Sequence, residues 1–181
     1  MATHTGMTEP ELVKACMEND RLAQKALYDK YKRAMYTLAY RIMGNFEDAN
    51  DVLQEAFVKI FRGLPGFRGE STLGAWIKTI VVRTAYSKLR KEKRFFEPVD
   101  NIASSMTIDW GHRLDADYLE QAIMALPEGY RSVFILIEVE GYSHKEVAAL
   151  LDISEGTSKS QLFYAKRKLR VLLKGHVNRD A

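Results

Sequence analysis

Along most of this chain, apolar residues recur three and four positions apart, which is the spacing of a buried helix face. Only four of the 181 residues are proline, so few positions interrupt that spacing. The exception is the stretch from Phe95 to about Arg113, which has no sustained period and exceeds the usual length of a connection. We therefore expect an all-α protein with two small helical domains, residues 1–94 and 115–181, joined by a flexible linker over residues 95–114.

The amino-terminal domain is expected to contain a long helix from about Asp20 to Met43. Its apolar stripe consists of Ala23, Leu27, Ala34, Leu38 and Ile42. Gly44 can adopt the left-handed conformation that ends a helix, and Asn45 can cap the next one. The buried face of that second helix consists of Ala49, Val52, Leu53, Ala56, Phe57, Ile60 and Phe61. Its opposite, polar face carries Asp51, Gln54, Glu55 and Arg62.

Residues 63–71 break the helical pattern. Three glycines and one proline in nine residues predict a loop, after which Ser71 or Thr72 caps a third helix. The buried side of this helix consists of Leu73, Trp76, Ile77, Ile80 and Val81. Its later turns are basic, with Arg83, Lys88, Arg90, Lys91, Lys93 and Arg94. Tyr86 lies among them, and such a mixture suits stacked bases and a phosphate track, although a solvated helix end explains the composition equally well.

The second domain begins with a helix over residues 116–126, for which Asp115 is a plausible cap. Pro127 ends that helix or opens the next, which runs from about Glu128 to Glu140 and stops at Gly141. The side chains expected to be mostly buried in it are Val133, Phe134, Leu136 and Ile137.

A short helix, a tight turn and a longer basic helix follow, and this order is typical of a helix-turn-helix unit. Ser143 and Glu146 form a capping box at the start of a helix that ends near Leu151. Ser154 caps the last helix, which runs to about Lys174. The shared core of the unit consists of Val147, Leu151, Ile153, Leu162, Ala165 and Leu169.

From Thr157 to Lys174 the last helix has six basic residues and no acidic one. A helix fits the major groove of B-DNA, so its amino-terminal half can reach base edges. The residues placed there are Lys159, Ser160, Gln161, Phe163 and Tyr164. Lys166, Arg167 and Lys168 are expected to contact phosphates, which fix position without reading sequence. A solvated basic face is the alternative, and the preceding capped helix and turn argue against it.

Charge and the remaining residues exclude other classes of function. Residues 65–94 carry eight basic and two acidic side chains, whereas residues 95–128 carry one and seven, an asymmetry that suggests a polyanionic partner. The single cysteine, Cys16, rules out an internal disulfide, and we expect it to be a buried structural thiol. With no signal peptide or membrane span visible, a cytoplasmic protein is the default. The four histidines lie far apart and no catalytic, phosphate-binding or metal-binding motif occurs, so we expect no enzyme activity, cofactor, metal or small-molecule substrate.

Two sets of motifs resemble the two domains of a bacterial RNA polymerase sigma factor of the extracytoplasmic-function (ECF) class. The first comprises Asp51-Val52-Leu53-Gln54-Glu55-Ala56-Phe57, Phe67-Arg68-Gly69-Glu70-Ser71 and Ala75-Trp76-Ile77. The second comprises Leu126-Pro127-Glu128, Arg131, Glu140-Gly141-Tyr142-Ser143, Glu146-Val147-Ala148 and Gly156-Thr157-Ser158-Lys159-Ser160. The resemblance covers about four fifths of the chain, and both sets in this order around a linker are highly specific.

The resemblance implies a transcription initiation factor that binds core RNA polymerase and directs it to promoters. Region 2, residues 1–94, would bind a polymerase coiled coil through Asp51, Gln54 and Glu55. It would hold a flipped base of the −10 element and contact the melting duplex through Phe67, Arg68, Gly69, Glu70, Ser71, Trp76, Arg83, Tyr86 and Arg90. Region 4, residues 115–181, would read the −35 element through Thr157, Lys159, Ser160, Gln161, Phe163, Tyr164 and Arg167. The linker would run near the polymerase active-site channel, and an anti-sigma factor is the expected further partner.

This sequence departs from the family pattern at three positions. Arg83 replaces the usual Asn and Ser87 a frequent Asp, both on the helix that melts the promoter. Ser158 replaces the apolar residue that follows Gly-Thr in the helix-turn-helix, which weakens one expected core contact.

A stand-alone helix-turn-helix regulator that does not bind polymerase is the alternative function. It accounts for residues 115–174 but leaves the polar face of Asp51, Gln54 and Glu55 and the glycine-rich loop unexplained. Co-purification with core RNA polymerase distinguishes the two, since such a regulator predicts none.

Overall fold

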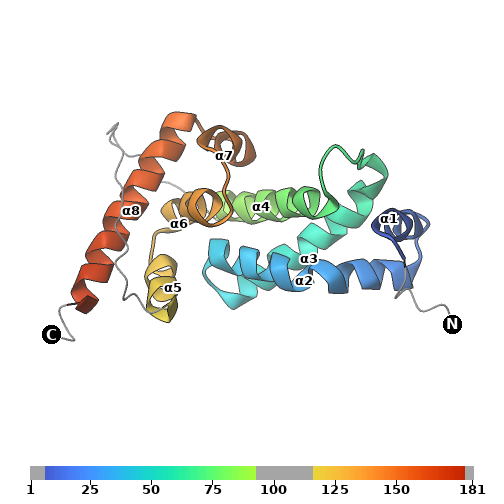
Figure 1. Ribbon diagram of the computed structural model, residues 1–181, viewed down its shortest axis with the longest axis horizontal. Coiled ribbons are helices and arrows are strands. Elements are labelled where there is room, and N and C mark those ends of the chain that lie inside the picture. Colours follow the sequence, from blue (N-terminus) through green and yellow to red (C-terminus); the bar gives the residue numbers. More distant parts are fainter. Residues whose placement is uncertain (1–6, 93–115, 178–181) are drawn as a thin grey trace. The chain divides into compact units, whose positions relative to one another are not determined.

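The computed structural model describes residues 7–92 and 116–177, with side chains up to residue 173 (Figure 1). Every secondary-structure element in these two ranges is helical, in agreement with the all-α prediction. The chain forms two compact units, residues 1–88 and 89–181. The expected linker over residues 95–114 and the cap Asp115 lie outside the described residues. None of the described helices has the length and apolar character needed to cross a bilayer.

The first unit begins with a short helix that the sequence analysis did not anticipate, α1 (Glu9–Met17). Thr8 donates hydrogen bonds to the Glu11 carboxylate from its backbone N and its hydroxyl, both at 2.8 Å, and so fixes the start of α1. Cys16 is buried in this helix as expected, and burial, with Asp20 nearby, raises the pKa of its thiol to about 11. The thiol is therefore protonated and unreactive at neutral pH.

Helix α2 (Arg21–Met43) follows, with the carboxylate of Asp20 accepting from the backbone N of Leu22 and Ala23. The predicted stripe is confirmed except at Ala34, which is exposed, while Met35 is buried instead. Glu9 ties α1 to α2, because its carboxylate accepts from Lys30 Nζ at 2.8 Å and from the Tyr31 hydroxyl at 3.0 Å. Gly44 ends α2 in the predicted left-handed conformation, with φ of 83°.

Helix α3 (Phe46–Gly63), the 3₁₀ turn η1 (Leu64–Gly66) and helix α4 (Leu73–Lys91) complete the unit. Asn45 caps α3 as predicted, since its side-chain oxygen accepts from the Asp48 backbone N at 2.8 Å. Thr72 rather than Ser71 caps α4, accepting from the Ala75 backbone N at 3.2 Å. The residues expected to be buried on α3 and α4 are buried except Phe61, Trp76 and Ile80, which are half-buried.

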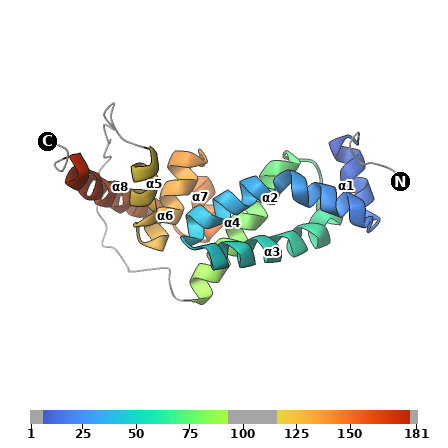
Figure 2. The ribbon, with the colours of Figure 1, turned by 90° about the horizontal axis from the view of Figure 1, so that it is seen from below.

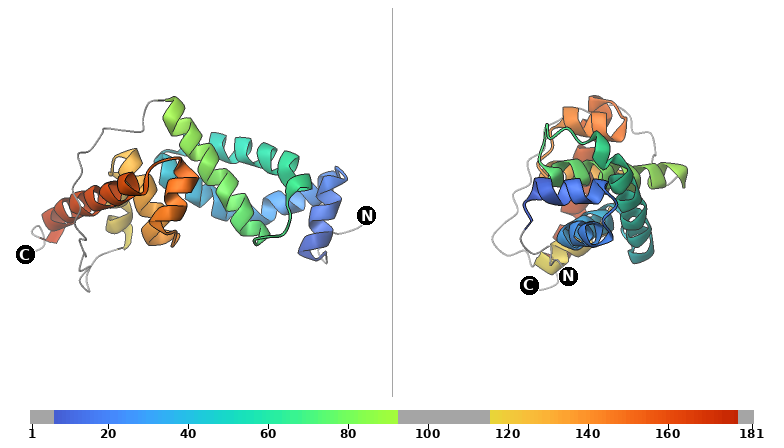
Figure 3. Two further views of the ribbon diagram at one scale, coloured as in Figure 1. Left: turned by 90° about the horizontal axis from the view of Figure 1, so that it is seen from above. Right: turned by 90° about the vertical axis from the view of Figure 1, so that its right-hand side faces the viewer.

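Helices α2 and α3 pack side by side, and α4 runs obliquely across both (Figures 2 and 3). At the crossing with α2 the chain approaches closely, because a Cβ on Gly74 would lie 3.3 Å from Tyr31 Cε1. Leu27, Ile42, Ile60 and Ile77 are among the large side chains fully buried between these helices. The arrangement leaves the polar face of α3 on the surface.

The second unit contains α5 (Ala116–Met124), α6 (Glu128–Phe134), the π-helical turn η2 (Ile135–Val139), α7 (His144–Leu151) and α8 (Glu155–Val177). Pro127 is the cap of α6, which decides between the two predicted roles. The single helix expected over residues 128–140 instead ends in η2, where the Glu140 backbone N donates to the Ile135 carbonyl at 3.0 Å. The wider turn changes the helical phase, so Ile135 is buried and Ile137 only half-buried. Helix α8 also continues beyond the predicted end at Lys174.

Helix α8 packs against α5, α6 and α7. Arg131 is buried, and its guanidinium donates to the carbonyls of Met124 at 2.8 Å and Leu126 at 3.0 Å, which satisfies the end of α5. Ser143 and Glu146 form the predicted capping box of α7. Asp152, with φ of 53°, makes the tight turn into α8, and Ser154 caps α8 by accepting from the Thr157 backbone N at 2.9 Å. The predicted helix-turn-helix core is buried, with Ile153 half-buried at its edge.

Candidate functional sites

The polar face of α3 has the exposure that the sequence predicts, because Asp51, Gln54 and Glu55 are all exposed. The helix positions them together, since residues three and four apart share one side of a helix. Glu55 forms an i,i+4 ion pair with Lys59 Nζ at 2.7 Å. Lys59 also donates to the hydroxyl of Thr84 on α4 at 3.2 Å.

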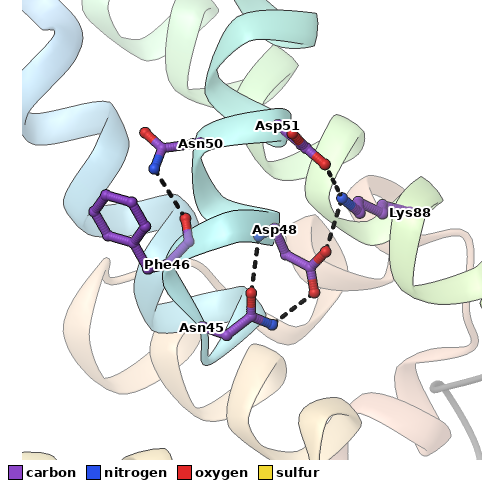
Figure 4. A network of polar contacts seen from close by, with 6 residues as sticks. All are labelled: Asn45, Phe46, Asp48, Asn50, Asp51 and Lys88. Carbon is purple, nitrogen blue, oxygen red and sulfur yellow. Dashed lines mark hydrogen bonds and ion pairs between the residues drawn. The ribbon is translucent and has the colours of Figure 1, made fainter.

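Asp51 belongs to a polar network that links α3 to α4 (Figure 4). Lys88 Nζ lies 2.8 Å from Asp48 Oδ1 and 2.8 Å from Asp51 Oδ2, and the second oxygen of Asp48 accepts from Asn45 Nδ2 at 2.6 Å. The side chains of Lys88 and Asp48 are each 19% exposed, whereas that of Asp51 is 68% exposed. Burial alone would lower the pKa of Lys88, but its hydrogen bonds to Asp48 and Asp51 raise it overall, so the ammonium stays charged. Lys88, which is largely shielded from solvent, therefore holds one oxygen of the exposed Asp51 carboxylate.

The glycine-rich loop carries an aromatic pair. The rings of Phe67, on the loop, and Trp76, on α4, have centroids 5.2 Å apart, and both side chains are half-buried. A Cβ on Gly63 would lie 3.3 Å from Trp76 Cζ2, so the indole packs on the end of α3. Gly69, with φ of +71°, makes the turn, and its neighbours Arg68, Glu70 and Ser71 are exposed. The loop and the start of α4 thus bring a half-buried aromatic pair beside exposed polar side chains, a combination that can hold a single unstacked base.

On α4, the predicted basic residues Arg83 and Arg90 are exposed, as is Ser87. Tyr86 differs from the prediction, because its side chain is only 5% exposed and packs inside the domain. Its ring occupies the apolar side of the helix between Val82 and Leu89, four residues before and three after it. In this structure Tyr86 therefore contributes to the apolar packing of α4. Lys93 and Arg94 lie outside the described residues.

The amino-terminal half of α8 presents fewer base-reading candidates than predicted. Lys159 and Arg167 are exposed, and Thr157, Ser160, Phe163 and Tyr164 are half-buried. Gln161 was expected to reach base edges but is only 3% exposed, and its Oε1 has no hydrogen-bond partner among the described residues. The buried residues of α8 recur at helical spacing and include Ser158, Gln161, Leu162, Ala165 and Leu169. Two polar residues, Ser158 and Gln161, are therefore part of the buried stripe.

The rest of that α8 face is linked to α6 and η2. Tyr164 stacks on Tyr130 of α6 with centroids 5.9 Å apart and meets Phe163 edge-on at 5.5 Å. Lys166 Nζ lies 2.6 Å from Glu138 Oε1 of η2, and the lysine side chain is 18% exposed. Of the three predicted phosphate contacts, Lys166 is thus held within the domain, whereas Arg167 and Lys168 are exposed.

Comparisons with known proteins agree with this geometry. The family model described as "Sigma-70 region 2" matches residues 27–95, and that described as "Sigma-70, region 4" matches residues 116–169. The ECF RNA polymerase sigma factor SigM of Mycobacterium tuberculosis strain H37Rv is 30% identical over 173 residues, covering 94% of this chain and 87% of SigM. The chain belongs to the ECF RNA polymerase sigma factors.

Two further similarities extend over both parts of this sigma factor. The ECF RNA polymerase sigma-E factor of Escherichia coli K12 is 30% identical, and the match covers 90% of this chain and 93% of the sigma-E factor. Among solved structures, the sigma factor RpoE from Bartonella quintana, crystallised in complex with the anti-sigma factor NepR, superposes with a TM-score of 0.58 at 28% identity, covering 83% of this chain and 96% of RpoE. A stand-alone helix-turn-helix regulator would not explain matches over both parts, so that alternative is not supported. Sigma factors are transcription initiation factors rather than catalysts.

The serine at position 158 of this sigma factor has a structural role that the sequence analysis did not foresee. Ser158 is fully buried, and its hydroxyl lies 2.9 Å from His144 Nδ1 at the start of α7. His144 is half-buried, and this burial, with Lys159 nearby, lowers its pKa. A polar contact between the two helices of the helix-turn-helix therefore replaces the missing apolar one.

Sequence reasoning also missed Lys88, which it counted among the basic residues of α4. Asp48 and Asp51 lie on one side of α3, but only the crossing of α3 and α4 shows that Lys88 meets both. Within the described ranges, no three His, Cys, Asp or Glu side chains gather closely enough to hold a metal ion.

Proposed function

We propose that this sigma factor uses three separate surfaces, one for core RNA polymerase and two for promoter DNA. Residues 1–94 act as region 2, residues 95–114 as the connection and residues 115–181 as region 4. The observation that supports this division best is that the polar face of α3 and the exposed basic residues of α4 and α8 occupy different helices.

The polymerase-binding surface is the face of α3 formed by Asp51, Gln54 and Glu55. Two carboxylates flank an amide there, and all three side chains are exposed. Such a surface suits a partner helix with basic and polar residues, because charge complementarity steers association and fixes register. The opposite face of α3 makes the core contacts, and within the described residues only Asp51 of the three side chains is also tied to α4, through Lys88.

The −10 surface combines the loop residues 67–71 with Trp76 and the basic side of α4. Flipping a base costs a few kcal/mol of unstacking, and aromatic contacts of about 1–3 kcal/mol per base offset that cost. Phe67 and Trp76 supply the aromatic faces, and Arg68, Glu70 and Ser71 supply polar groups for the edge of the base. Arg83 and Arg90 contact the phosphates of the separated strands. Tyr86 is left out of this surface because it is buried.

The −35 surface is the exposed side of α8. Thr157, Lys159 and Ser160 lie in the first turns of the helix, where base edges are within reach in the major groove. Phe163 and Tyr164 offer apolar contact, and Arg167 and Lys168 contact phosphates. Gln161 is left out because its side chain is buried.

Each unit alone offers a small DNA interface, so affinity depends on polymerase holding both units at once. The second contact then becomes intramolecular, and effective concentration supplies affinity that neither unit has alone. We therefore infer that the free protein binds promoter DNA poorly and that the holoenzyme binds it well.

An anti-sigma factor is the further partner that we infer. The structure of RpoE with NepR shows that a similar protein is bound by one. We also infer that the protein acts in the cytoplasm, where bacterial polymerase transcribes, and that it has no catalytic activity, cofactor or small-molecule substrate of its own.

Run-off transcription with purified core polymerase on a promoter library tests the proposal. The expected result is initiation at defined positions downstream of a shared pair of elements, only when the protein is present. Failure to associate with polymerase, or initiation at random positions, would contradict it.

A further inference from the structure

Lys88 lies in the basic stretch of α4 but does not face the surface that its neighbours Arg83 and Ser87 share. Its side chain is 19% exposed and its ammonium lies 2.8 Å from carboxylate oxygens of both Asp48 and Asp51 (Figure 4). An ammonium engaged in this way is not available to a phosphate. The contact has a different consequence, because Asp51 is one of the exposed residues of the polymerase-binding face.

The network has a fixed end and an exposed end. At the fixed end, Asp48 is held through both oxygens, one by Lys88 and the other by Asn45 Nδ2 at 2.6 Å, while Asn45 itself caps α3. At the exposed end, Asp51 gives one oxygen, Oδ2, to Lys88 and remains 68% exposed. Because Asp48 restrains Lys88, Lys88 in turn restrains the side chain of Asp51.

We propose that Lys88 is a positioning residue for polymerase capture, which holds the carboxylate of Asp51 in one orientation on the α3 face. This inference rests on the proposed role of that face. Restricting an interface side chain before binding removes an ordering cost that would otherwise be incurred on association. Lys88 thus links the helix that contacts DNA to the face that binds polymerase, without contacting either partner.

The test compares Lys88→Met with Lys88→Arg in equilibrium binding of the full chain to purified core polymerase. Methionine keeps the apolar length of the side chain but removes the ammonium, whereas arginine can still bridge both carboxylates. Lys88→Met is expected to weaken binding about three- to tenfold, the equivalent of ordering one side chain, and Lys88→Arg to restore most of it. Should Lys88→Met fail to fold, as judged by circular dichroism, Lys88→Gln provides the uncharged variant. Unchanged binding by a folded uncharged variant overturns the proposal.

Two lysines control for the loss of a positive charge. Lys32→Met removes an exposed ion pair with Asp29 on α2 and should leave polymerase binding unchanged. Lys59→Met removes a cation beside Glu55 on the same two helices as Lys88. Lys59 is 46% exposed and pairs with one carboxylate, whereas Lys88 is 19% exposed and pairs with two, so Lys59→Met should weaken binding less than Lys88→Met. An equal loss would mean that any cation near the face has this effect, and the positioning role would be wrong.

A double-mutant cycle separates this proposal from the function on which it rests. If Lys88 acts through Asp51, the double variant Lys88→Met/Asp51→Asn should bind no more weakly than Asp51→Asn alone, whereas additive losses would contradict it. If Asp51→Asn alone binds polymerase normally, the proposed binding face is wrong. If Asp51→Asn weakens binding and Lys88→Met does not, only the positioning role fails. If Lys88 instead contacted a phosphate, Lys88→Met would reduce the salt dependence of DNA binding. Under the positioning role, Lys88→Met should leave that salt dependence unchanged.

Discussion

Helices α3 and α8 both carry a proposed partner surface, but the buried stripes opposite these surfaces differ in composition. In α3 the stripe is wholly apolar, from Ala49 to Ile60, so the exposed side is fixed by the hydrophobic pattern alone. In α8 the stripe includes Ser158 and Gln161, which are polar. Hydropathy therefore places the surface residues correctly on α3 and misplaces Gln161 on α8. The difference shows that a polar residue on a binding helix can belong to the core. Whether it is buried or exposed depends on the helices packed around it.

The largest expected effect concerns α3. Asp51→Lys combined with Gln54→Ala should abolish polymerase capture, with a loss of at least about 30-fold, because a reversed charge then faces the partner. The fold should be retained, because both side chains are exposed and Lys88 keeps its ion pair with Asp48 when that with Asp51 is lost. Co-purification with core polymerase measures the first effect and circular dichroism the second. Unfolding of the variant would mean that this face of α3 is core rather than surface.

On α8, Lys159→Ala should change the preference for one position of the −35 element. Losing a base contact costs about 1–3 kcal/mol at the position read. Transcription from promoters randomised at the −35 element measures the preference, with polymerase capture as the control that should not change. A uniform loss over all promoters would reassign Lys159 to a phosphate contact.

Gln161→Leu tests the comparison directly. Because Gln161 Oε1 is buried without a hydrogen-bond partner among the described residues, an apolar side chain of similar size should be neutral or stabilise the fold by about 1 kcal/mol. The −35 preference should not change. Urea denaturation and the same randomised promoters provide the two measurements. An altered −35 preference would return Gln161 to the DNA-reading surface, and a destabilised protein would mean that its amide contributes to the core.

Much of the fold follows from the sequence, because long apolar stripes and capping residues act locally. Asn45, Ser143 and Ser154 cap the helices they were expected to cap. Helix α1 was missed although Thr8 and Glu11 have capping-box spacing, since nine residues show little periodicity. The shift from Ala34 to Met35 arises because two neighbouring apolar residues fit the helical spacing almost equally well.

The candidate sites were less predictable, since they depend on how helices cross. The exposure of Asp51, Gln54 and Glu55 was foreseen, but the ion pair of Asp51 with Lys88 was not, because 37 residues separate them. Burial of Tyr86 and the π-helical turn that positions Glu138 near Lys166 likewise depend on tertiary packing. The roles of these sites in binding stay predictions.

The smallest expected effect comes from the polar contact in the helix-turn-helix. The pKa of His144 is lowered in the folded protein by burial and then by Lys159, with Lys166 acting in the same direction and Glu155 and Glu138 opposing it. The unfolded chain therefore binds the proton more tightly, so stability is complete above the unfolded value of about 6.5 and falls as pH drops through the folded pKa. His144→Gln should flatten that dependence. Urea midpoints between pH 5 and 8 measure it, and an equal slope in both proteins would exclude His144 as its origin.

The central claim is that polymerase must hold both DNA-binding surfaces before either is effective. Footprinting one promoter with the chain alone and with the holoenzyme, at the same salt concentration, tests it most directly. We predict protection of the −35 and −10 elements by the holoenzyme and none by the free chain at the same concentration. Tight, sequence-specific protection of both elements by the free chain would contradict the account.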